Sequence, residues 1–299
     1  MSETTRAGFV AVLGAPNVGK STLVNRLVGS KVSIVSPKVQ TTRARVMGIA
    51  MRGTTQVAFL DLPGVFAPKR RLDRAMIDAA WRGAADADVV LLLIDAIRGL
   101  DDNTETIIAG LTERGIEAVA AINKIDLVKR PALLGLAASL NARAKFAATF
   151  MLSASTGDGV DDLMKDLMAR MPEGPFLYPE DQLTDMSERL LAAEITREQL
   201  FLQLHQELPY SVAVETEKWE EFKDGSARVE QVIYVQRDSQ RKIVIGEKGA
   251  RIKAIGAAAR TELACVLGRK VHLFLHVKVA EDWAEKRDFY RVWGLEYDA

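Results

Sequence analysis

The sequence has a single cysteine and three histidines among its 299 residues. A lone cysteine, Cys265, excludes an intrachain disulfide and is typical of proteins that work in a reducing compartment. Because Cys265 lies in an apolar, helix-like run, we expect its side chain to pack in a core. Scattered histidines without companion cysteines do not form the spacing of a zinc site.

Long hydrophobic runs are missing as well. No apolar run approaches the roughly 18 residues that a membrane-spanning helix needs. The first residues, Met-Ser-Glu-Thr-Thr-Arg, lack the apolar segment of a signal peptide. These features predict a soluble cytoplasmic protein, or at most one that lies at a membrane surface.

The chain also has no excess of charge of either sign, because Lys plus Arg and Asp plus Glu both number 40. Overall neutrality argues against a nucleic-acid partner, but the charges are unevenly distributed. Residues 237–270 hold nine Lys or Arg against three Asp or Glu, whereas residues 180–230 hold five against thirteen. Only the local surface meets a phosphate backbone, so the basic segment remains compatible with nucleic acid. A charged run is more often a solvated face, and charge alone does not establish binding.

The chain does have the length of two domains and, near its start, a glycine motif. At 299 residues it is long for one hydrophobic core, and its 48% hydrophobic and 27% charged residues are a globular composition.

The apolar run of residues 9–13 precedes Gly-x4-Gly-Lys-Ser, and a helical pattern follows over residues 21–28. A strand, a glycine loop and a helix start in this order predict a phosphate-binding loop. The nucleotide-binding residues expected here are Gly14, Ala15, Pro16, Asn17, Val18, Gly19, Lys20, Ser21 and Thr22.

Several side chains of this loop have distinct expected roles. Gly14 and Gly19 occupy places where a Cβ would clash or forbid the required backbone angles. Lys20 is expected to reach the β- and γ-phosphates, and the Ser21 hydroxyl to ligate Mg²⁺. A chance glycine turn is the alternative interpretation, against which the flanking strand and helix argue.

Two segments downstream are candidate switches. Residues 33–43 form a polar loop that carries Thr41-Thr42-Arg43, where a threonine hydroxyl can close over Mg²⁺ and the γ-phosphate. Ordinary turn chemistry is the alternative for these threonines. The basic, proline-bearing residues 66–74 are the second candidate, and they lead into a predicted helix over residues 72–85.

The second switch candidate follows a strand that ends in Asp61-Leu62-Pro63-Gly64. This strand, residues 56–60, comes after a turn at Arg52-Gly53, so we expect an antiparallel hairpin at the sheet edge. Asp61 at the carboxyl end of the strand is placed to hold the Mg²⁺ site, and the Gly64 N–H to meet the γ-phosphate.

The predicted buried strand over residues 118–122 ends in Asn123-Lys124-Ile125-Asp126. The Asp126 carboxylate can accept both the N1–H and the N2–H₂ of guanine, donors that adenine lacks. Asn123 can bond the O6/N7 edge and fix the loop, while the Lys124 stem lies over the base. Ser153-Ala154 ends the last strand, where the Ala154 N–H can reach guanine O6. The spacing therefore predicts guanine over adenine.

These segments together resemble the five boxes of the Ras-like GTPase fold, in family order and over residues 8–172. The resemblance implies an α/β domain with a P-loop NTPase sheet and one antiparallel edge strand. It implies GTP/GDP and Mg²⁺ as ligands, with the metal at Ser21, Thr42 and Asp61. The candidate catalytic residues are Asn17, Lys20, Thr42 and Gly64.

One position departs from the small signalling GTPases of this fold. Val65 stands directly after the third-box glycine, where those proteins place a water-orienting glutamine. An apolar side chain cannot hydrogen-bond the attacking water, so the resemblance implies slow hydrolysis with water ordered by another group. In some relatives an asparagine at the place of Asn17 ligates K⁺, and we extend that role to Asn17. The alternative is that Asn17 only caps the loop.

The second half of the chain carries a different glycine motif. Residues 173–184 contain the prolines and polar residues of a linker, which divides a domain of residues 1–172 from one of residues 185–299. Helix, strand, strand, helix, helix and strand patterns then follow, over residues 186–208, 211–217, 227–235, either side of 246–249, and 271–279. Gly246-Glu247-Lys248-Gly249 lets a nucleic-acid backbone approach closely. The expected RNA-binding residues are Gly246, Glu247, Lys248, Gly249, Arg251 and Lys253.

The string Val-Ile-Gly-Glu-Lys-Gly-Ala-Arg-Ile and the element order resemble the α+β type II KH domain, and the basic segment coincides with it. A lone Gly-x-x-Gly would more often be a helix–helix turn. No aromatic stacking pair is evident, so we expect bases to be read by hydrogen bonds and an apolar groove. Trp219, Trp283 and Trp293 are interpreted as packing residues.

A Ras-like GTPase domain followed by one type II KH domain resembles the bacterial Era family over nearly the whole chain. That resemblance implies a ribosome-assembly GTPase that binds the 3′ end of 16S rRNA and the 30S subunit, and it implies a peripheral membrane contact that the sequence itself does not show. We expect a monomer in which GTP orders the switches, shifts the KH domain and exposes its RNA groove.

Two rival functions make different predictions. A signalling switch would use its C-terminal module to bind a protein or the membrane surface, and its RNA affinity would not depend on the Gly-x-x-Gly turn. An ATPase would keep its nucleotide preference after Asp126→Asn. Both remain alternatives at the level of sequence.

Overall fold

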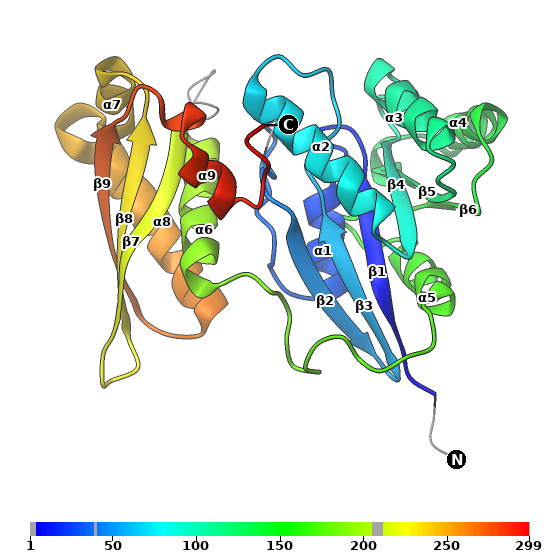
Figure 1. Cartoon of the computed structure of the whole chain (residues 1–299), viewed down its shortest axis with the longest axis horizontal. Helices are drawn as coiled ribbons and strands as arrows, with labels where there is room; N and C mark the ends of the chain where they lie inside the picture. The colour runs from blue at the N-terminus through cyan, green and yellow to red at the C-terminus, as the bar shows by residue number, and fades with distance from the viewer. Residues whose placement is uncertain (1–3, 39–40, 205–211, 299) are drawn as a thin grey trace. The chain divides into compact units, whose positions relative to one another are not determined.

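The computed structural model describes residues 4–38, 41–204 and 212–298, which form two compact units. Unit 1 comprises Met1–Ser33, Thr42–Asp185 and Trp293–Ala299, and unit 2 comprises Ile34–Thr41 and Met186–Val292. The short segment Ile34–Thr41 therefore groups with the second half of the chain, although it lies in the first half of the sequence. Figure 1 labels the helices and strands of both units.

Unit 1 is built on a six-stranded sheet with the order β2-β3-β1-β4-β5-β6. Its strands are β1 (Arg6–Leu13), β2 (Val46–Arg52), β3 (Thr55–Asp61), β4 (Val89–Asp95), β5 (Ala118–Asn123) and β6 (Ala148–Met151). All neighbouring pairs are parallel except β2 with β3, which confirms the predicted antiparallel strand at the edge. The carboxyl ends of β1, β3 and β5 therefore lie at one edge of the sheet, where open α/β sheets bind ligands.

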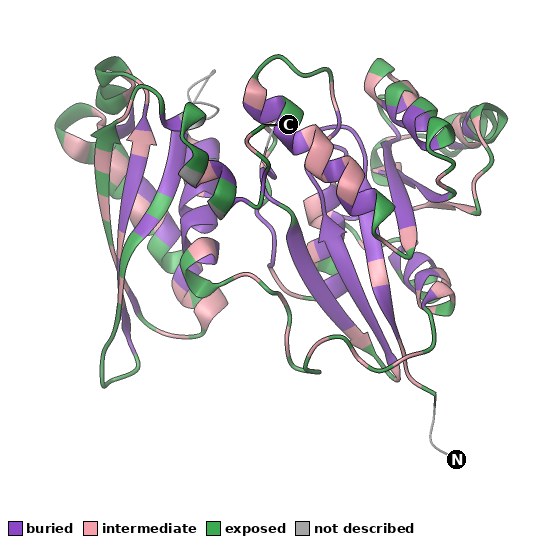
Figure 2. Cartoon of the chain, viewed as in Figure 1, coloured by how far each residue is buried: buried purple, intermediate pink, exposed green. Residues whose placement is uncertain are grey.

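Helices cover both faces of this sheet, and α1 and α2 lie on opposite faces (Figure 1). The helices are α1 (Lys20–Val28), α2 (Arg71–Ala85), α3 (Asp102–Glu113), α4 (Arg130–Arg143) and α5 (Val160–Arg170), with a 3₁₀ turn η1 (Ile125–Leu127). Double coverage explains why β4 and β5 are almost continuously apolar. From Val90 to Ile94 every residue of β4 is buried, and β2 to β5 are mostly buried (Figure 2), whereas the residues of the edge strand β6 are half-buried.

Residues 177–184, near the end of the main segment of unit 1, are hydrogen-bonded to strands β2 and β3. The Gln56 side chain accepts from the backbone N–H groups of Leu177 and Tyr178 at 2.8 and 3.0 Å, and donates to the Tyr178 carbonyl at 2.8 Å. The Thr184 hydroxyl donates to the Met47 carbonyl at 2.7 Å. Gln56 is fully buried, so its amide takes the place of water for the backbone groups of Leu177 and Tyr178.

The C-terminal residues also belong to unit 1. Trp293 and Leu295 are buried, and the Arg43 guanidinium lies 5.4 Å from the centre of the Trp293 ring. Arg71, the first residue of α2, lies 4.6 Å from the centre of the Tyr297 ring. Nothing in the local sequence pattern predicts this return of the chain.

Unit 2 has a three-stranded sheet, β7-β8-β9, with helices packed against it. Its elements are α6 (Glu188–Gln203), β7 (Val212–Glu221), β8 (Ala227–Val235), α7 (Asp238–Ile245), η3 (Glu247–Gly249), α8 (Ala250–Leu267), β9 (Val271–Val279), η4 (Trp283–Glu285) and α9 (Arg287–Val292). β7 and β8 are antiparallel, whereas β8 and β9 are parallel. The predicted α-β-β-α-α-β order is confirmed, and the predicted elements at residues 205–211 lie outside the described residues.

Two predictions about individual residues have clear outcomes. Trp283 and Trp293 are buried, which confirms their packing role, and Trp219 packs half-buried against the second core. The prediction that Cys265 packs in a core is wrong, because its side chain is exposed. The buried face of α8 follows Ile255, Ala259 and Leu263 at four-residue spacing, and a residue two positions after Leu263 points away from that face.

The described helices include none that is both long and apolar enough to cross a lipid bilayer.

Candidate nucleotide site and nucleic-acid interface

The loop between β1 and α1 has the backbone of a phosphate-binding loop. Gly14 and Gly19 have φ angles of +154° and +100°. A Cβ at Gly14 would lie 2.5 Å from the Leu93 carbonyl oxygen, and one at Gly19 would lie 2.4 Å from the Asn123 side-chain nitrogen. Packing and conformation therefore both require glycine at these two positions.

Lys20 begins α1 and its side chain curls back over the loop. Its ammonium donates to the carbonyl oxygens of Gly14 and Ala15 at 3.2 and 3.1 Å, and the residue is only 6% exposed. Burial lowers the pKa of Lys20 to about 8, and the negative charge of Asp61 opposes that shift. Lys20 thus remains a cation at neutral pH, at the mouth of a loop of backbone N–H groups.

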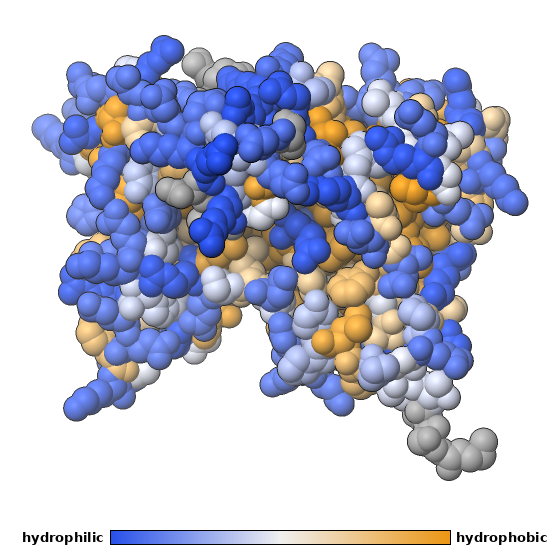
Figure 3. All heavy atoms as spheres, viewed as in Figure 1, coloured by the Kyte–Doolittle hydropathy of each residue, from blue (hydrophilic) through white to orange (hydrophobic). Residues whose placement is uncertain are grey.

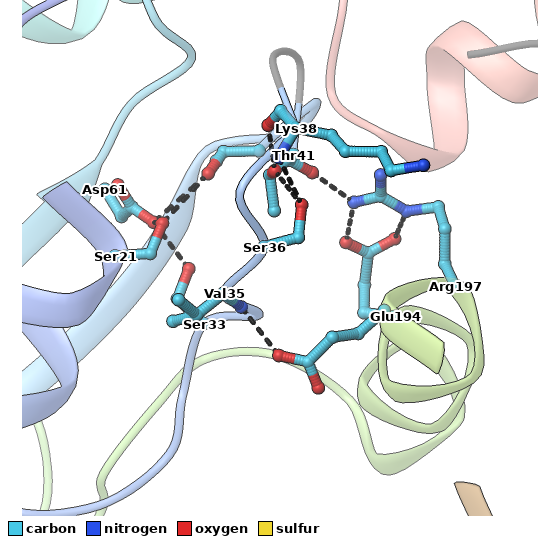
Figure 4. A network of polar contacts seen from close by, with 11 residues as sticks. Ser21, Ser33, Val35, Ser36, Lys38, Thr41, Asp61, Glu194 and Arg197 are labelled. Atoms are coloured by element: carbon cyan, nitrogen blue, oxygen red, sulfur yellow. Dashed lines mark hydrogen bonds and ion pairs between the residues drawn. The ribbon is translucent and has the colours of Figure 1, made fainter. Parts of the chain in front are cut away.

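Side-chain oxygens from four segments of the chain converge beside this loop (Figure 4). Ser21 donates to Asp61 Oδ2 at 2.6 Å, and its hydroxyl lies 3.1 Å from the hydroxyl of Thr42. Ser33 also donates to Asp61 Oδ2, at 2.5 Å. Burial raises the pKa of the Asp61 carboxyl, and hydrogen bonds from Ser21, Ser33 and Thr42 and the charge of Lys20 oppose that rise. Four segments distant in sequence therefore place hydroxyl and carboxylate oxygens at one point.

The chemistry of this cluster fits Mg²⁺. The second carboxylate oxygen of Asp61, Oδ1, is buried with no hydrogen-bond partner among the described residues. A buried, unpartnered carboxylate oxygen is costly unless a cation or its water shell occupies the space beside it. Hydroxyl and carboxylate oxygens are also the ligands that a hard divalent cation prefers.

The third-box segment lies against the phosphate loop. A Cβ at Gly64 would come within 3.0 Å of the Pro16 backbone, so glycine permits this approach. The Val65 N–H donates to the Gly14 carbonyl at 3.2 Å, and the Val65 side chain is buried in the core. Val65 therefore anchors the segment and presents no polar group to a water molecule.

The fourth and fifth boxes are tied to the phosphate loop through one side chain. Asn123 donates to the Val18 carbonyl at 2.8 Å and accepts from the Ala154 N–H at 2.9 Å. The Asn123 amide thus braces two loops, and in this structure the Ala154 N–H expected at guanine O6 is directed to Asn123. Ser153 is fully buried beside it.

Lys124 and Asp126, of the fourth box, lie at the edge of the phosphate loop and of the expected base site. Lys124 has a φ of +68°, and its ammonium donates to the Asn17 carbonyl at 2.8 Å and to Asp95 Oδ2 at 2.6 Å. Its stem is therefore held across the edge of the phosphate loop. Asp126, in the 3₁₀ turn η1, is exposed and open to a base.

Sequence reasoning missed several residues that shape this site. Asp95 holds Lys124, Ser33 holds Asp61, and Arg98 donates to the Pro16 carbonyl at 3.0 Å. Arg26 donates to the Ala154 carbonyl at 2.5 Å and steadies the fifth box. Of these residues, only Asp95 could have been found from the sequence. It ends a buried parallel strand, as Asp61 and Asn123 do, and the ends of such strands are where this kind of sheet binds ligands.

The second glycine motif, in unit 2, lies between α7 and α8. Gly246, Lys248 and Gly249 have φ angles of +72°, +49° and +79°. A Cβ at Gly246 would lie 2.7 Å from the Cβ of Arg251, whereas one at Gly249 would meet nothing within 4 Å. The turn therefore leaves open space above Gly249, as an approaching strand requires.

Charged side chains surround this turn. Glu247, Lys248, Arg251 and Lys253 are exposed, and Arg251 also donates to the Ile243 carbonyl at 2.9 Å, which caps α7. Ile243 itself is 46% exposed. Figure 3 shows mainly hydrophilic atoms over the α7 end of unit 2, with a small apolar patch among them.

Unit 1 is a P-loop sheet with four nucleotide motifs after the carboxyl ends of β1, β3, β5 and β6 and a fifth, Thr41-Thr42, ahead of β2. Together with an α-β-β-α-α-β unit that bears a Gly-x-x-Gly turn, it defines a GTPase coupled to a KH domain. Family models agree, since residues 9–124 match the model described as 50S ribosome-binding GTPase and residues 207–284 match a KH domain.

The chain belongs to the Era family of GTPases. It is 59% identical to GTPase Era of Bradyrhizobium sp. (strain BTAi1), covering 98% of this chain and 95% of that protein. It is also 59% identical to GTPase Era of Agrobacterium fabrum, covering 98% and 92%. The predicted family, fold class and GTPase activity are thereby confirmed, with GTP/GDP and Mg²⁺ as ligands.

Solved structures of Era have the same fold. Aquifex aeolicus Era bound to GDP·AlF4⁻ superposes with a TM-score of 0.92 at 38% identity, covering 97% of this chain and 99% of that one. An Era complex with MgGDPNP and nucleotides 1506–1542 of 16S ribosomal RNA gives the same TM-score, identity and coverage. At this similarity the match extends to both units of the chain.

Proposed function

We propose that this GTPase is a ribosome-assembly factor that binds the 3′ end of 16S rRNA through its KH domain, under the control of bound nucleotide. The observation that carries the proposal is the presence, in one chain, of the Ser21–Thr42–Asp61 cluster and of an open Gly-x-x-Gly turn. The Era relative crystallised with MgGDPNP and a 16S rRNA fragment supports the same pairing of ligands.

For the nucleotide, we assign phosphate binding to residues 14–22 and the magnesium site to Ser21, Thr42 and Asp61. Lys20 supplies the buried cation, and the Gly64 N–H faces the γ-phosphate. Mg²⁺, when bound, neutralises charge on the phosphate oxygens. Asp126 selects guanine, Lys124 covers the base, and Asn123 holds the two loops around it.

Hydrolysis requires a group other than residue 65 to orient water, because Val65 is buried and apolar. We propose that Asn17 contributes to a K⁺ site that supplies positive charge near the phosphates. Its φ of +65° lies in the left-handed region, which asparagine adopts more readily than most residues, and this places Asn17 within the turn of the phosphate-binding loop. Hydrolysis measured in KCl and in NaCl tests this role, and equal rates would contradict it.

For RNA, we assign backbone contact to Gly246, Glu247, Lys248 and Gly249, with Arg251 and Lys253 on the flanking helix. The RNA sugar-phosphate passes over Gly249, where no side chain intervenes, and exposed lysines and arginines meet the phosphates. For this function we divide the chain into a GTPase domain of residues 1–172, a linker of residues 173–184 and a KH domain of residues 185–299, although Trp293–Ala299 group with unit 1.

Filter binding of a single-stranded oligonucleotide with the 3′-terminal 16S rRNA sequence tests the proposal. Protein loaded with GDPNP should bind more tightly than protein loaded with GDP, and Gly249→Asp should weaken both at least about tenfold, because it places a carboxylate where phosphate passes. Gly225→Asp, the same substitution at a glycine of unit 2 with a φ of +79° and open space around it, is the matched control and should leave RNA affinity unchanged. RNA affinity that survives Gly249→Asp would favour the rival in which this module binds a protein or a membrane.

The localisation and the oligomeric state of the protein follow from the same proposal. A factor that binds 16S rRNA and the 30S subunit works in the cytoplasm, and one copy of the chain carries both binding motifs, so a monomer suffices. Contact with a membrane surface remains a prediction from family resemblance. Flotation with anionic vesicles tests it, and absence of the protein from the lipid fraction would contradict it.

A further inference from the structure

The first switch segment is held by α6, a helix of the second half of the chain. Residues Ile34–Thr41 group with Met186–Val292 in unit 2, whereas Ser33 and Thr42 on either side belong to unit 1. The chain therefore passes into unit 2 between Ser33 and Ile34 and returns to unit 1 between Thr41 and Thr42. Figure 4 shows the polar contacts on both sides of the peptide bond between Thr41 and Thr42.

Three contacts within unit 2 hold this segment. The Arg197 guanidinium donates to the Thr41 carbonyl at 2.5 Å, and the Val35 N–H donates to Glu198 Oε1 at 2.7 Å. Lys38 donates to the Leu204 carbonyl at the end of α6. Within the segment, the Thr41 hydroxyl donates to the Lys38 carbonyl at 2.7 Å.

Arg197 is itself held in one orientation. It is 1% exposed, and its Nε donates to Glu194 Oε1 at 2.9 Å while Nη2 pairs with Glu194 Oε2. Its guanidinium also lies 5.2 Å from the centre of the Phe201 ring. A buried arginine clamped by a bidentate carboxylate and an aromatic ring is a rigid donor, which loses little freedom when it grips a carbonyl.

We propose that Arg197 is a positioning residue for GTP hydrolysis: by holding the Thr41 carbonyl, it fixes the place of Thr42 beside Ser21 and Asp61. The inference rests on the magnesium site proposed above. Thr42 Oγ1 lies 3.1 Å from Ser21 Oγ and 3.4 Å from Asp61 Oδ2, while the carbonyl one peptide bond away is bound to Arg197. Because the peptide is planar, a carbonyl held by Arg197 also fixes the plane that contains the N and Cα atoms of Thr42.

The arrangement also couples α6 to the nucleotide. Coupling between sites is reciprocal, so contacts that hold Thr42 at the nucleotide favour the grip of Arg197 on Thr41, and loss of that grip weakens Thr42 at the nucleotide. GDP lacks the γ-phosphate that the first switch closes over, so we expect GDP affinity to be insensitive to Arg197.

The test is steady-state hydrolysis by the full chain carrying both Arg197→Met and Glu194→Gln. The double substitution removes the two buried charges together, so that neither is left unpaired. Loss of a hydrogen bond from a charged donor changes an equilibrium about tenfold or more. We therefore expect kcat to fall about tenfold, the Mg²⁺ concentration for half-maximal rate to rise, and GDPNP affinity to fall relative to GDP affinity.

Matched variants separate positioning from folding. Arg197→Lys keeps one donor for the Thr41 carbonyl and should recover part of kcat. Arg189→Met removes an exposed arginine of the same helix, one that donates to the Thr216 and Glu217 carbonyls, and should leave all three readouts unchanged. Hydrogen exchange of the Thr42 and Arg43 amides should be faster in the double variant with GDPNP bound.

Two outcomes overturn different statements. Thr42→Ala that hydrolyses GTP at the unaltered rate contradicts the proposed magnesium site itself. The other outcome is that Thr42→Ala is impaired while the double variant keeps its kcat, its Mg²⁺ dependence and its ratio of GDPNP to GDP affinity. That result overturns only the positioning role of Arg197 and leaves the magnesium site in place.

Discussion

The two glycine loops of this chain both suit a phosphate, but they are built in opposite ways. The loop of residues 14–21 is enclosed, because Gly14 and Gly19 are in contact with neighbouring atoms and Lys20 is buried. The turn of residues 246–249 is open, with Lys248 exposed and free space above Gly249. An enclosed loop recognises one small ligand in one pose, whereas an open turn accepts a long polymer that passes over it.

The largest difference between the loops is expected from removing their lysines. Lys20→Met deletes a buried cation that faces the phosphates, and we expect GTP affinity to fall at least about a hundredfold, as for the loss of a desolvated charged contact. Titration with a fluorescent GTP analogue measures it. Lys165→Met, an exposed change on α5, is the control. An affinity within threefold of the parent protein would show that Lys20 does not contact the phosphates.

Base selection is expected to depend on one exposed carboxylate. Asp126→Asn replaces an acceptor of two guanine donors by a group that offers a donor in its place, so GTP affinity should fall about a hundredfold. Competition between GTP and ATP measures the change in preference. A preference for GTP that is unchanged in the variant would return the ATPase alternative to consideration.

The same substitution in both loops gives a direct contrast in stability. Gly19→Ala combines a positive φ with a Cβ placed 2.4 Å from the Asn123 amide, and we expect it to lower the free energy of unfolding by about 2–4 kcal/mol. Gly249→Ala meets open space, so only the backbone conformation is disfavoured, by about 1–2 kcal/mol. Urea denaturation of both variants tests the contrast, and equal losses would mean that enclosure does not matter.

The smallest effect is expected at Lys248. Lys248→Met removes one exposed charge near an RNA backbone, so affinity for the 16S oligonucleotide should fall only several-fold. The slope of log affinity against log salt concentration should become less steep by about one. Binding isotherms between about 50 and 200 mM KCl measure both quantities. If Lys248→Met lowered RNA affinity by as large a factor as Lys20→Met lowers GTP affinity, the distinction between the enclosed and the open loop would be contradicted.

Local patterns were sufficient for the order of elements and for the boxes. The glycine loop, the antiparallel edge strand and the α-β-β-α-α-β order each depend on short-range signals, and all are confirmed. Helix ends were less exact. The helical patterns predicted over residues 21–28 and 72–85 begin one residue earlier in the structure, at Lys20 and Arg71, because the apolar period does not mark the boundary residue of a helix.

Long-range contacts left no trace in the local sequence. Ser33 and Asp61, Asn123 and Val18, and Arg197 and Thr41 are separated by 28, 105 and 156 residues. Each pair forms only after the sheet or a helix has placed both partners. The sequence therefore predicts residues for the nucleotide site, but it does not reveal the side chains that hold those residues in place.

The central claim is that one chain links a guanine nucleotide to RNA, and linkage offers its most direct test. GDPNP affinity should be measured by titration with and without the 3′-terminal 16S oligonucleotide, alongside RNA affinity with GDPNP and with no nucleotide. The account predicts that RNA tightens GDPNP binding by the same factor as GDPNP tightens RNA binding. A GDPNP affinity unaltered by saturating RNA would contradict it.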